Sequence, residues 1–363
     1  RVRQRTNEVP MFLRNAWYVA AWGGEVTDAP LARTLLDEPV VLFRTGDGTP
    51  VALEDRCCHR QLPLSMGKVV GDGIQCGYHG LRFDAEGRCT GVPGQSAIPP
   101  GAAVRAYPLV ERWGWVWIWM GDPARADDSA IPDWRFMDRP DWKVVPGNGG
   151  RPIHTRANYE LITDNLLDLS HVGYVHPDTI GSDNVVEFPV RTERKVDRVV
   201  MTRLMPDVEP PPFHRMAGGF QGNVDRWMIV EAALPALIDV DVGSAEVGGG
   251  ALESDRMQGI AYHALNAPTP ETATTTHFFY AHARFFRTDS AEMDEVYRRD
   301  FYRIFMEDVA IVEAQQASLD RNPAAERIDI NVDAPGLAMR ALLRERIAAE
   351  RTVTPTRNRR RSA

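Results

Sequence analysis

The 363-residue chain has few cysteines and no long apolar segment. Four cysteines, three of them between positions 57 and 76, do not make a disulfide framework, so we expect a reducing compartment, the cytoplasm. No apolar run approaches the length of a membrane span, and no charged-then-apolar signal peptide opens the chain. The net charge of −8 argues against a general nucleic-acid binder, which would carry a basic stripe. We therefore expect neither a membrane nor a nucleic acid as a partner.

The chain also lacks the glycine-rich fingerprint that opens a dinucleotide-binding βαβ unit, so we do not expect it to bind NAD(P)H itself. The composition is that of a globular protein, with 44% hydrophobic and 25% charged residues, and the length allows two domains. Residues 121–150 are rich in Asp, Pro and Gly, as at a domain boundary. We predict one domain over residues 1–135, a second over 136–352, and a flexible basic tail over 353–363.

The two halves differ in their secondary-structure signals. Residues 11–120 form short apolar runs separated by Gly, Pro and Asp, including a hairpin around Asp47-Gly48, which predicts an all-β domain. "RWGWVWIWM" alternates Trp113, Trp115, Trp117 and Trp119 with aliphatic residues, which favours a strand buried on both faces. The second half predicts a helix from Tyr159, an antiparallel sheet over 196–286 and a helix over 291–319, hence an α+β domain.

Two cysteines and two histidines indicate a metal site near the N-terminus. Cys57 and His59 are separated by one residue, and Cys76 and His79, sixteen residues further on, are separated by two. A structural zinc site of this composition usually takes both cysteines from one half and both histidines from the other, whereas each half here supplies one of each. This pattern suits a [2Fe–2S] cluster in which two thiolates bind one iron and two imidazoles bind the other.

Two further cysteines are not expected to be ligands. Cys58 is adjacent to His59 and cannot replace Cys57 without compressing the pair, so we interpret it as a neighbouring thiol. Cys89 lies outside the pattern and is interpreted as a small buried hydrophobic residue.

A second group of candidate ligands lies between Asp164 and His176. Asp164, Asp168 and His171 are spaced i, i+4 and i+7, which predicts one face of a helix. His176 follows His171 by five residues, and a regular α-helix would rotate it about 140° away. Both histidines bind one metal only if the helix loosens between them, and we expect this near Gly173.

Asp308 is the candidate third ligand. It lies on an otherwise apolar helical face beside Phe305 and Val309, where a carboxylate needs a partner because burying an unpaired charge is costly. Two histidines and one carboxylate form the facial triad of non-haem Fe(II) sites, which leaves positions open for O₂. The neighbouring Glu307 is the alternative carboxylate.

These motifs resemble those of the Rieske non-haem iron oxygenases over nearly the full length of the chain. The first motif is similar to the Rieske signature C-x-H…C-x2-H and its "PLS" and "YHG" flanks, although Cys58 stands where the family most often has proline. Within the family the chain looks most like the oxygenase component of the vanillate O-demethylase group, which includes aryl-methyl and aryl-sulfonate monooxygenases. The segments that carry this resemblance are "RNAWYVAAW", "GDPA", "NYELITDNLLDLSHVGYVHP", "TPET", "ARFF" and "EDVAIVEAQQ".

The resemblance implies an N-terminal all-β Rieske domain and a C-terminal catalytic domain in which a curved antiparallel sheet and flanking helices enclose a cavity. It also implies a head-to-tail homotrimer, in which the cluster of one subunit meets the iron of the next. The implied residue roles are three: Cys57, His59, Cys76 and His79 bind the [2Fe–2S] cluster, His171, His176 and Asp308 bind mononuclear Fe(II), and Asp168 is the catalytic carboxylate that bridges the two centres.

The implied reaction is a monooxygenation of an aromatic substrate with O₂. Electrons would come from NAD(P)H through a separate flavin and iron–sulfur reductase. Hydroxylation of a methoxy carbon would lead to O-demethylation of a methoxy-aryl acid such as a vanillate-like compound. The alternatives are hydroxylation of an aryl methyl group or of the ring of another substrate such as an aryl sulfonate, cis-dihydroxylation and, more remotely, a Rieske electron carrier or a zinc-binding interaction module. His263 and Asn266 are candidate pocket residues on a strand expected to line the cavity.

Overall fold

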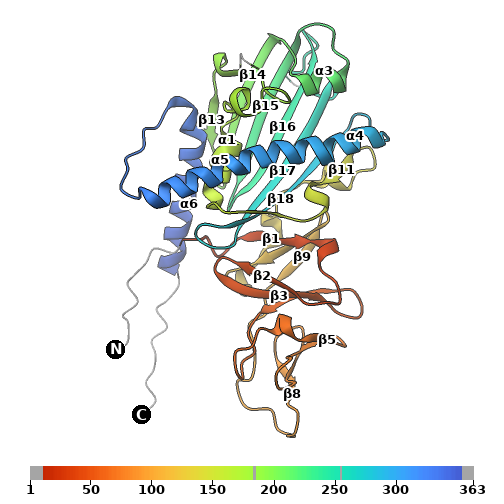
Figure 1. The fold of residues 1–363 in the computed structure, drawn as a ribbon, viewed down its shortest axis with the longest axis vertical. Helices are drawn as coiled ribbons and strands as arrows, with labels where there is room; N and C mark the ends of the chain where they lie inside the picture. The colour runs from red at the N-terminus through yellow and green to blue at the C-terminus, as the bar shows by residue number, and fades with distance from the viewer. Residues whose placement is uncertain (1–10, 183–184, 254–255, 354–363) are drawn as a thin grey trace.

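The computed structural model describes residues 11–182, 185–253 and 256–353, which form two β-rich regions stacked end to end (Figure 1). The N-terminal region contains three small antiparallel sheets, and the C-terminal region contains one large antiparallel sheet with helices packed against it. This is the α+β arrangement that the sequence predicts. Within the described part of the chain, no helix has the length and apolar character needed to cross a membrane.

The N-terminal sheets are built from short strands joined by tight turns. The hairpin predicted at Asp47-Gly48 is present between β3 and β4, and Gly48 there has a φ of +89°, which favours glycine. The first sheet has the order β1-β10-β9, from β1 (Trp17–Trp22), β9 (Leu109–Arg112) and β10 (Trp115–Trp119). The second is β2 (Leu31–Leu35), β3 (Glu38–Arg44) and β4 (Pro50–Glu54). The third is β5 (Lys68–Val70), β6 (Gly73–Gln75), β7 (Arg82–Phe83) and β8 (Cys89–Gly91).

Strand β10 joins the two regions because both of its faces are buried, as predicted. Trp115, Trp117 and Trp119 pack into a cluster that also contains Leu265 and Phe279 of the large sheet. The alternate residues Val116 and Ile118 face a second cluster inside the N-terminal region. The tryptophan side chains are therefore core residues that fix the N-terminal region against the large sheet, not a stacking surface.

The large sheet has the order β11-β18-β17-β16-β15-β14-β13, and β12 pairs with β18. Its long central strands alternate side chains between two buried faces, as period-two geometry requires. The strand bounds are β11 (Lys143–Pro146), β12 (Ile153–Thr155), β13 (Arg191–Arg194), β14 (Arg198–Val208), β15 (Val224–Ala233), β16 (Leu237–Glu246), β17 (Ile260–Pro270) and β18 (Thr276–Arg284).

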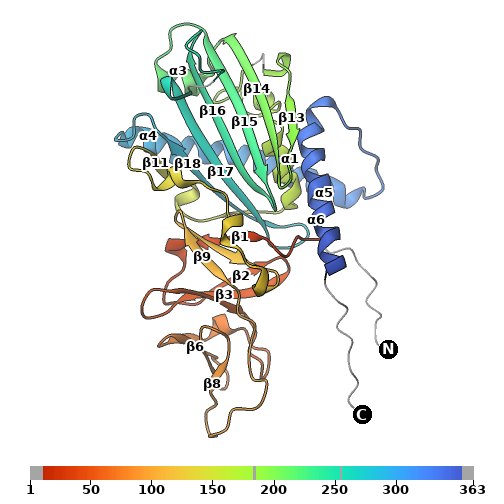
Figure 2. The ribbon, with the colours of Figure 1, turned by 180° about the vertical axis from the view of Figure 1, so that it is seen from behind.

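The described residues form six α-helices that pack against this sheet. In Figure 1 the long helix α5 crosses in front of the sheet, and in the reverse view of Figure 2 the sheet lies in front of it. The helices are α1 (Tyr159–Leu167), α2 (Val172–Val175), α3 (Pro212–Gly218), α4 (Ala291–Val296), α5 (Tyr302–Arg321) and α6 (Ala334–Val353). A single π-helical turn, Tyr297–Phe301, joins α4 to α5 and stacks the Tyr297 ring on the Phe301 ring at 4.6 Å.

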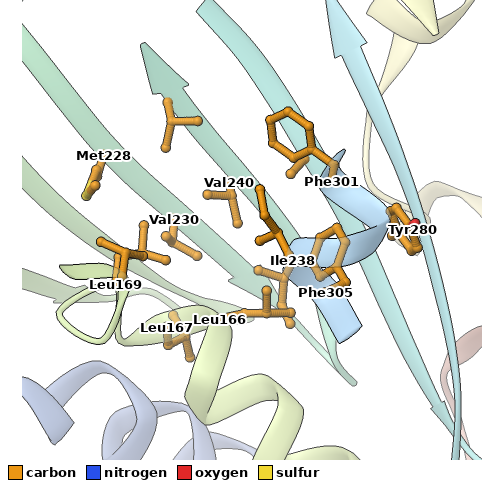
Figure 3. Packing of buried hydrophobic residues seen from close by; sticks show 14 of the residues in the cluster. Leu166, Leu167, Leu169, Met228, Val230, Ile238, Val240, Tyr280, Phe301 and Phe305 are labelled. Atoms are coloured by element: carbon orange, nitrogen blue, oxygen red, sulfur yellow. The ribbon is translucent and has the colours of Figure 1, made fainter. Parts of the chain in front are cut away.

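The main hydrophobic core lies between the sheet and the helices (Figure 3). Leu166 and Leu169 from the α1 end, Met228 and Val240 from the sheet, and Phe305 of α5 belong to it. Burial of this apolar area stabilises the domain by roughly 25 cal/mol per Å². It also holds the end of α1 and the middle of α5 against the same face of the sheet.

Three features differ from the sequence-based expectations. The helix that begins at Tyr159 ends at Leu167, and α6 has no counterpart in the sequence-based description. Helix α6 continues to Val353, so the predicted start of the tail at position 353 is still helical, and the rest of the tail lies outside the described residues.

The domain boundary predicted at 135/136 stays a prediction. It falls at a short 3₁₀ turn, Arg135–Asp138, between the last N-terminal strand and the first strand of the large sheet.

Candidate metal centres and active site

Two loops of the N-terminal region carry the four Cys and His residues of the first motif. Cys57 and Cys76 are 2% and 3% exposed, whereas His59 and His79 lie at the surface with their ring centroids 4.5 Å apart. The structure therefore brings all four residues to one end of the molecule. The thiols face inward and the imidazoles face solvent.

The two loops share one backbone pattern. The amide of Cys57 donates to the carbonyl of Leu62 at 2.8 Å, and the amide of Cys76 donates to the carbonyl of Leu81 at 2.8 Å. In each loop the residue four positions after the cysteine has a positive φ, +61° at Gln61 and +75° at Gly80. The equivalent turns present their cysteines in the same way, although the histidines follow at different spacings.

Contacts beneath the loops hold them together. The buried Asp55 carboxylate accepts hydrogen bonds from the amide (2.7 Å) and hydroxyl (2.6 Å) of Ser65, within the "PLS" flank. A Cβ at Gly67 would lie 2.0 Å from the Gln75 carbonyl oxygen, so only glycine permits this approach of the two halves. The "PLS" flank and Gly67 thus set the spacing of the loops.

This donor set fits a Rieske [2Fe–2S] cluster. Burial, together with the adjacent Cys76 thiol, raises the pKa of Cys57 to about 11. A thiol with a raised pKa is a poor thiolate by itself, and coordination to a metal would ionise Cys57. The exposed imidazoles would place the second iron at the surface. Cys58 is exposed, and Cys89 is buried in the cluster behind the loops, as expected for a small hydrophobic residue.

The second group of candidate ligands lies where α1 ends. Asp168 is the C-cap of α1 and has non-helical φ and ψ of −109° and 88°, so the predicted single helical face of Asp164, Asp168 and His171 is wrong. A new one-turn helix, α2, follows, with His171 at its N-cap and His176 at its C-cap. The interruption at Asp168 and the end of α2 at His176, where φ and ψ are −124° and 43°, let both imidazoles turn toward α5.

His171, His176 and Asp308 have ligand atoms that all lie within 4.8 Å of one another. Asp308 Oδ1 is 3.1 Å from Nε2 of His176 and 3.3 Å from Nε2 of His171. Asp308 is only 8% exposed; burial by itself raises the pKa of its carboxyl, but hydrogen bonds from the two imidazoles lower it to about 2. The carboxylate is therefore ionised and faces two Nε2 atoms, a set of donors that fits one divalent metal ion.

The other ring nitrogen of each histidine is occupied. Nδ1 of His171 donates to the backbone carbonyl of Asp168, and Nδ1 of His176 donates to Oε2 of Glu307 at 2.8 Å. These bonds favour a proton on Nδ1. In the structure Nε2 of each ring faces the Asp308 carboxylate, and a metal ion bound between them would take the place of the Nε2 proton. Glu307 thus contacts a ligand from the far side of the ring and does not replace Asp308. Asn165 donates to Asp308 Oδ1 at 3.1 Å and orients that carboxylate.

Asp168 and Asp164 have different environments. The Asp168 carboxylate accepts from the amide of Ser170 at 2.8 Å, and only its backbone carbonyl contacts His171 within this chain. Arg203 donates to the Ser170 hydroxyl at 2.8 Å, so a buried guanidinium lies behind this turn. Asp164 instead binds Arg340 of α6, with Nε to Oδ2 at 2.9 Å, and does not reach the histidines.

The three candidate ligands open into a cavity between the sheet and α5. Its wall is mainly apolar, with Met228 and Val240 from the sheet and Phe301 and Phe305 from the helix. The cavity measures about 70 Å³ in this structure, and its apolar wall suits contact with an aromatic group. Polar residues also reach it: Arg226, Tyr262 and His282 from three strands, and His214 from α3.

Of the two pocket candidates, Asn266 lines this cavity and His263 does not. Asn266 is fully buried, and its Nδ2 donates to the Ala264 carbonyl at 2.8 Å. His263 lies three positions earlier on β17, so it points to the opposite face, where Nδ1 lies 2.8 Å from Asp239 and its ring stacks on Phe136. Period-two geometry excludes that both residues face one side of a strand.

The sequence also left several cavity residues undetected. Arg226 sits two positions before Met228 on β15, and His282 lies in the alternating run "THFFYAHAR" of β18. Alternation shows which residues share a face, but it does not show which face is buried against α5. The sequence did contain one signal for these cavity residues: Arg226 and His282 are polar residues on otherwise apolar strands.

The two metal-binding groups lie at opposite ends of the described chain. In Figure 1 the strands β5 to β8 that carry the Cys and His loops are at the bottom, whereas α1 and α5 are in the upper region. Direct contact between the two groups within one chain is therefore excluded.

Both halves of the chain match known protein families. Residues 16–108 match the Rieske [2Fe-2S] domain, and residues 155–349 match the Vanillate O-demethylase oxygenase C-terminal domain. The chain is 43% identical to the putative toluene-4-sulfonate monooxygenase system iron-sulfur subunit of Comamonas testosteroni, over 89% of this chain and 94% of the relative. It is 36% identical to the vanillate O-demethylase oxygenase subunit of Pseudomonas sp. strain HR199, over 94% of this chain and 96% of the relative.

A solved structure has the same fold. The crystal structure of dicamba monooxygenase with non-heme iron and dicamba is 32% identical to the chain and superposes with a TM-score of 0.80. The match covers 94% of this chain and 99% of that chain.

Proposed function

The chain belongs to the vanillate O-demethylase family of Rieske non-haem iron oxygenases, and we propose that its reaction is the O-demethylation of a methoxy-aryl acid. It is the oxygenase component of a Rieske aromatic monooxygenase, with a [2Fe–2S] cluster and a mononuclear iron. Hydroxylation of the methoxy carbon gives a hemiacetal that collapses to a phenol and formaldehyde. One oxygen atom of O₂ enters the product, and two electrons and two protons reduce the other to water.

The ligands of the mononuclear iron in this proposal are His171, His176 and Asp308. The supporting observation is the convergence of their three ligand atoms within 4.8 Å beside an apolar cavity. Fe(II) held by two imidazoles and one carboxylate supplies open positions at which O₂ is activated. The residues of the chain orient the imidazoles through Nδ1, hold the carboxylate ionised and keep bulk water away from the substrate.

The ligands of the cluster are Cys57, His59, Cys76 and His79. Buried thiols and surface imidazoles on matched turns support this assignment. The [2Fe–2S] cluster supplies single electrons, which it receives from a separate reductase that oxidises NAD(P)H. We place the division between the Rieske and catalytic domains near residue 135, in the segment between β10 and β11.

A head-to-tail homotrimer is part of the proposal, because it brings the two centres together. Asp168 and His171 line an open groove, and the exposed His79 belongs to the small sheet β5 to β8 at the bottom of Figure 1. A neighbouring subunit that places its His79 in this groove would reach Asp168, which then connects the two centres. Head-to-tail contacts of this kind close into rings. We place the assembly in the cytoplasm, consistent with four cysteines that form no disulfide.

One alternative reaction has specific support. The relative with 43% identity is named a putative toluene-4-sulfonate monooxygenase subunit, so the alternative substrate is an aryl sulfonate hydroxylated at its methyl group. The two reactions differ in their products, because only O-demethylation releases formaldehyde.

The test is substrate-dependent O₂ uptake by the iron-loaded enzyme with a surrogate reductase. The panel contains methoxybenzoates, methylbenzoates and toluene-4-sulfonate, and formaldehyde is measured in parallel. Stoichiometric formaldehyde with a methoxybenzoate supports O-demethylation. An alcohol product from toluene-4-sulfonate, without formaldehyde from any methoxybenzoate, favours the alternative. The absence of coupled O₂ uptake with every aryl acid contradicts both.

A further inference from the structure

Arg226 places a guanidinium group in the wall of the active-site cavity. The residue lies on β15, on the same face as Met228, and is 2% exposed. It lines the same cavity as His171, His176 and Asp308. Strand β15 begins at Val224, near α3, so Arg226 belongs to the α3 end of this cavity (Figure 1).

The partners of Arg226 are neutral. Nη1 donates to the Ser182 hydroxyl at 2.8 Å, and Nη2 donates to the Ile180 carbonyl at 3.0 Å, while Nε is buried with no acceptor. Among the residues that the structure describes, no carboxylate forms an ion pair with this guanidinium. Two of its five N–H groups are satisfied by described residues, and none of these residues supplies a carboxylate as counter-charge.

Two other buried arginines of the same sheet show the contrast. Arg284 on β18 has a carboxylate partner, with Nη2 2.6 Å from Asp294 Oδ1. Arg203 on β14 donates to Ser170, and the nearby Asp168 carboxylate stabilises its charge electrostatically. Arg226 is therefore the buried arginine of this group whose positive charge has no acidic neighbour.

The charge of Arg226 persists at neutral pH. Burial lowers its pKa to about 10, and the proximity of Arg203 contributes, so the group stays protonated at pH 7. A buried charge without a partner is costly, and evolution keeps one where a ligand completes it.

The other polar groups of the cavity do not compensate the charge. Asp308 faces the two histidines, and burial lowers the pKa of His282 to about 3, which keeps that imidazole neutral. The unpartnered Oδ1 of Asn266 and Nε2 of His282 are neutral hydrogen-bonding atoms. No described residue supplies the counter-charge, and an anion bound in the cavity would supply it.

We infer that Arg226 is the specificity-determining residue that binds the acid group of the substrate, a carboxylate or a sulfonate on an aromatic ring. The inference rests on the proposed function, since it takes the substrate to be an aromatic compound in this cavity. The guanidinium pairs with the anion while the apolar wall covers the ring, and the reacting substituent points toward the iron ligands. A neutral compound of the same shape leaves the guanidinium unpaired.

The first test measures binding to the unmodified holoenzyme under anaerobic conditions by calorimetry. The probes are 4-methoxybenzoate, toluene-4-sulfonate and the neutral isostere 4-methoxybenzamide. At least one anion is expected to bind about tenfold or more tightly than the amide, the range of a charge-assisted hydrogen bond. The two anions distinguish a carboxylate site from a sulfonate site. An amide that binds within threefold of both anions overturns the inference without any variant.

The second test compares three variants by the ratio of anion to amide affinity. Arg226→Gln keeps a donor for Ser182 or Ile180 but loses the charge, and the ratio is expected to fall to about one. Arg226→Lys keeps the charge and is expected to retain a preference for the anion. The comparison variant is Arg203→Gln, a buried arginine on the neighbouring strand outside the cavity lining. Its charge acts on Arg226 from nearby, so we expect the ratio to fall, but less than in Arg226→Gln.

The outcomes separate this inference from the proposed function. A ratio that is unchanged in Arg226→Gln, or that falls equally in Arg203→Gln, overturns the role of Arg226. Efficient O-demethylation of a neutral methoxyarene supports the reaction but contradicts the anion site. If Arg226→Gln does not fold, the wild-type ratio and the Arg226→Lys ratio decide the question.

Discussion

Two consecutive residues of α5, Glu307 and Asp308, contact the two ring nitrogens of one imidazole. Glu307 Oε2 lies 2.8 Å from Nδ1 of His176, and Asp308 Oδ1 lies 3.1 Å from Nε2 of the same ring. Together the acidic groups raise the pKa of His176 above its usual value, although burial opposes this effect. The orientation of this candidate iron ligand is therefore set by one helix alone.

Glu307→Gln is expected to weaken Fe(II) binding by about 10–100-fold, since loss of a carboxylate behind a metal-bound histidine has this effect. The glutamine keeps an acceptor for Nδ1 but no longer raises the basicity of the ring. Titration of the iron-depleted protein with Fe(II) measures the change. Arg303→Gln, which removes only the exposed partner of Glu307, is the control and should change the affinity less than threefold. Equal affinities in Glu307→Gln and wild type contradict the prediction.

Asp308→Ala, His171→Ala and His176→Ala are each expected to lose the mononuclear iron and turnover while keeping the visible spectrum of the cluster. Each substitution removes one of three protein ligands, and the cluster loops lie at the other end of the chain. Iron content per cluster and visible absorption are measured together. Full iron content in Asp308→Ala means that another carboxylate is the ligand, and Glu307 is then the nearest.

His59→Cys and His79→Cys are expected to lower the reduction potential of any cluster that assembles. Thiolates add negative charge, and potentials shift from the Rieske range, about −150 mV and above, toward about −400 mV for all-cysteine clusters. Redox titration and visible spectra follow this change. Cys58→Ser is the matched control for Cys57→Ser: the exposed thiol is dispensable and the buried one is not. The reverse result shows that the two cysteines are assigned wrongly.

Asp168→Asn is expected to keep both metals and the proposed trimer, and to nearly abolish electron transfer from the reduced cluster to the iron. The asparagine retains an acceptor for the Ser170 amide, so the local turn is preserved. The backbone carbonyl that holds His171 is unaffected, which separates a role in electron transfer from a role in iron binding. Single-turnover reoxidation of the cluster is the measurement, and wild-type speed in the metal-replete variant refutes the bridge.

The candidate metal ligands could be named from the sequence because most of them are close together in the chain. The cluster motif needs only local turns, and His171 and His176 flank one helical turn. Asp308 was found by a charge on an apolar helical face, which the structure buries. The spacing of the candidate ligands and the charge on the apolar helical face depend only on nearby residues, so they can be recognised without knowing the tertiary structure.

The sequence-based predictions that are wrong concern where a helix ends and which face of a strand is buried. The spacing of Asp164, Asp168 and His171 is helical, yet α1 ends at Leu167 because Asp168 caps it and the next turn packs separately. His263 was assigned to the cavity without regard to the two faces of a strand. The place of Arg226 in the cavity wall could not be predicted, because it depends on which residues distant in the sequence pack opposite β15. The helix α6 did have a readable signal, since Met339, Leu342 and Leu343 recur at helical spacing.

The π-helical turn at Tyr297–Phe301 sets the orientation of α4 relative to α5 without affecting the position of Asp308 on α5. A π turn holds about one residue more than an α turn, so deleting one residue would restore a regular helix and rotate α4 by about 100° relative to α5. Asp308 would stay against its histidines, while Tyr297 would lose its place against Phe301. A change of length at this turn would thus rearrange the rings packed on Phe301, which lines the cavity, and leave the three candidate iron ligands in place.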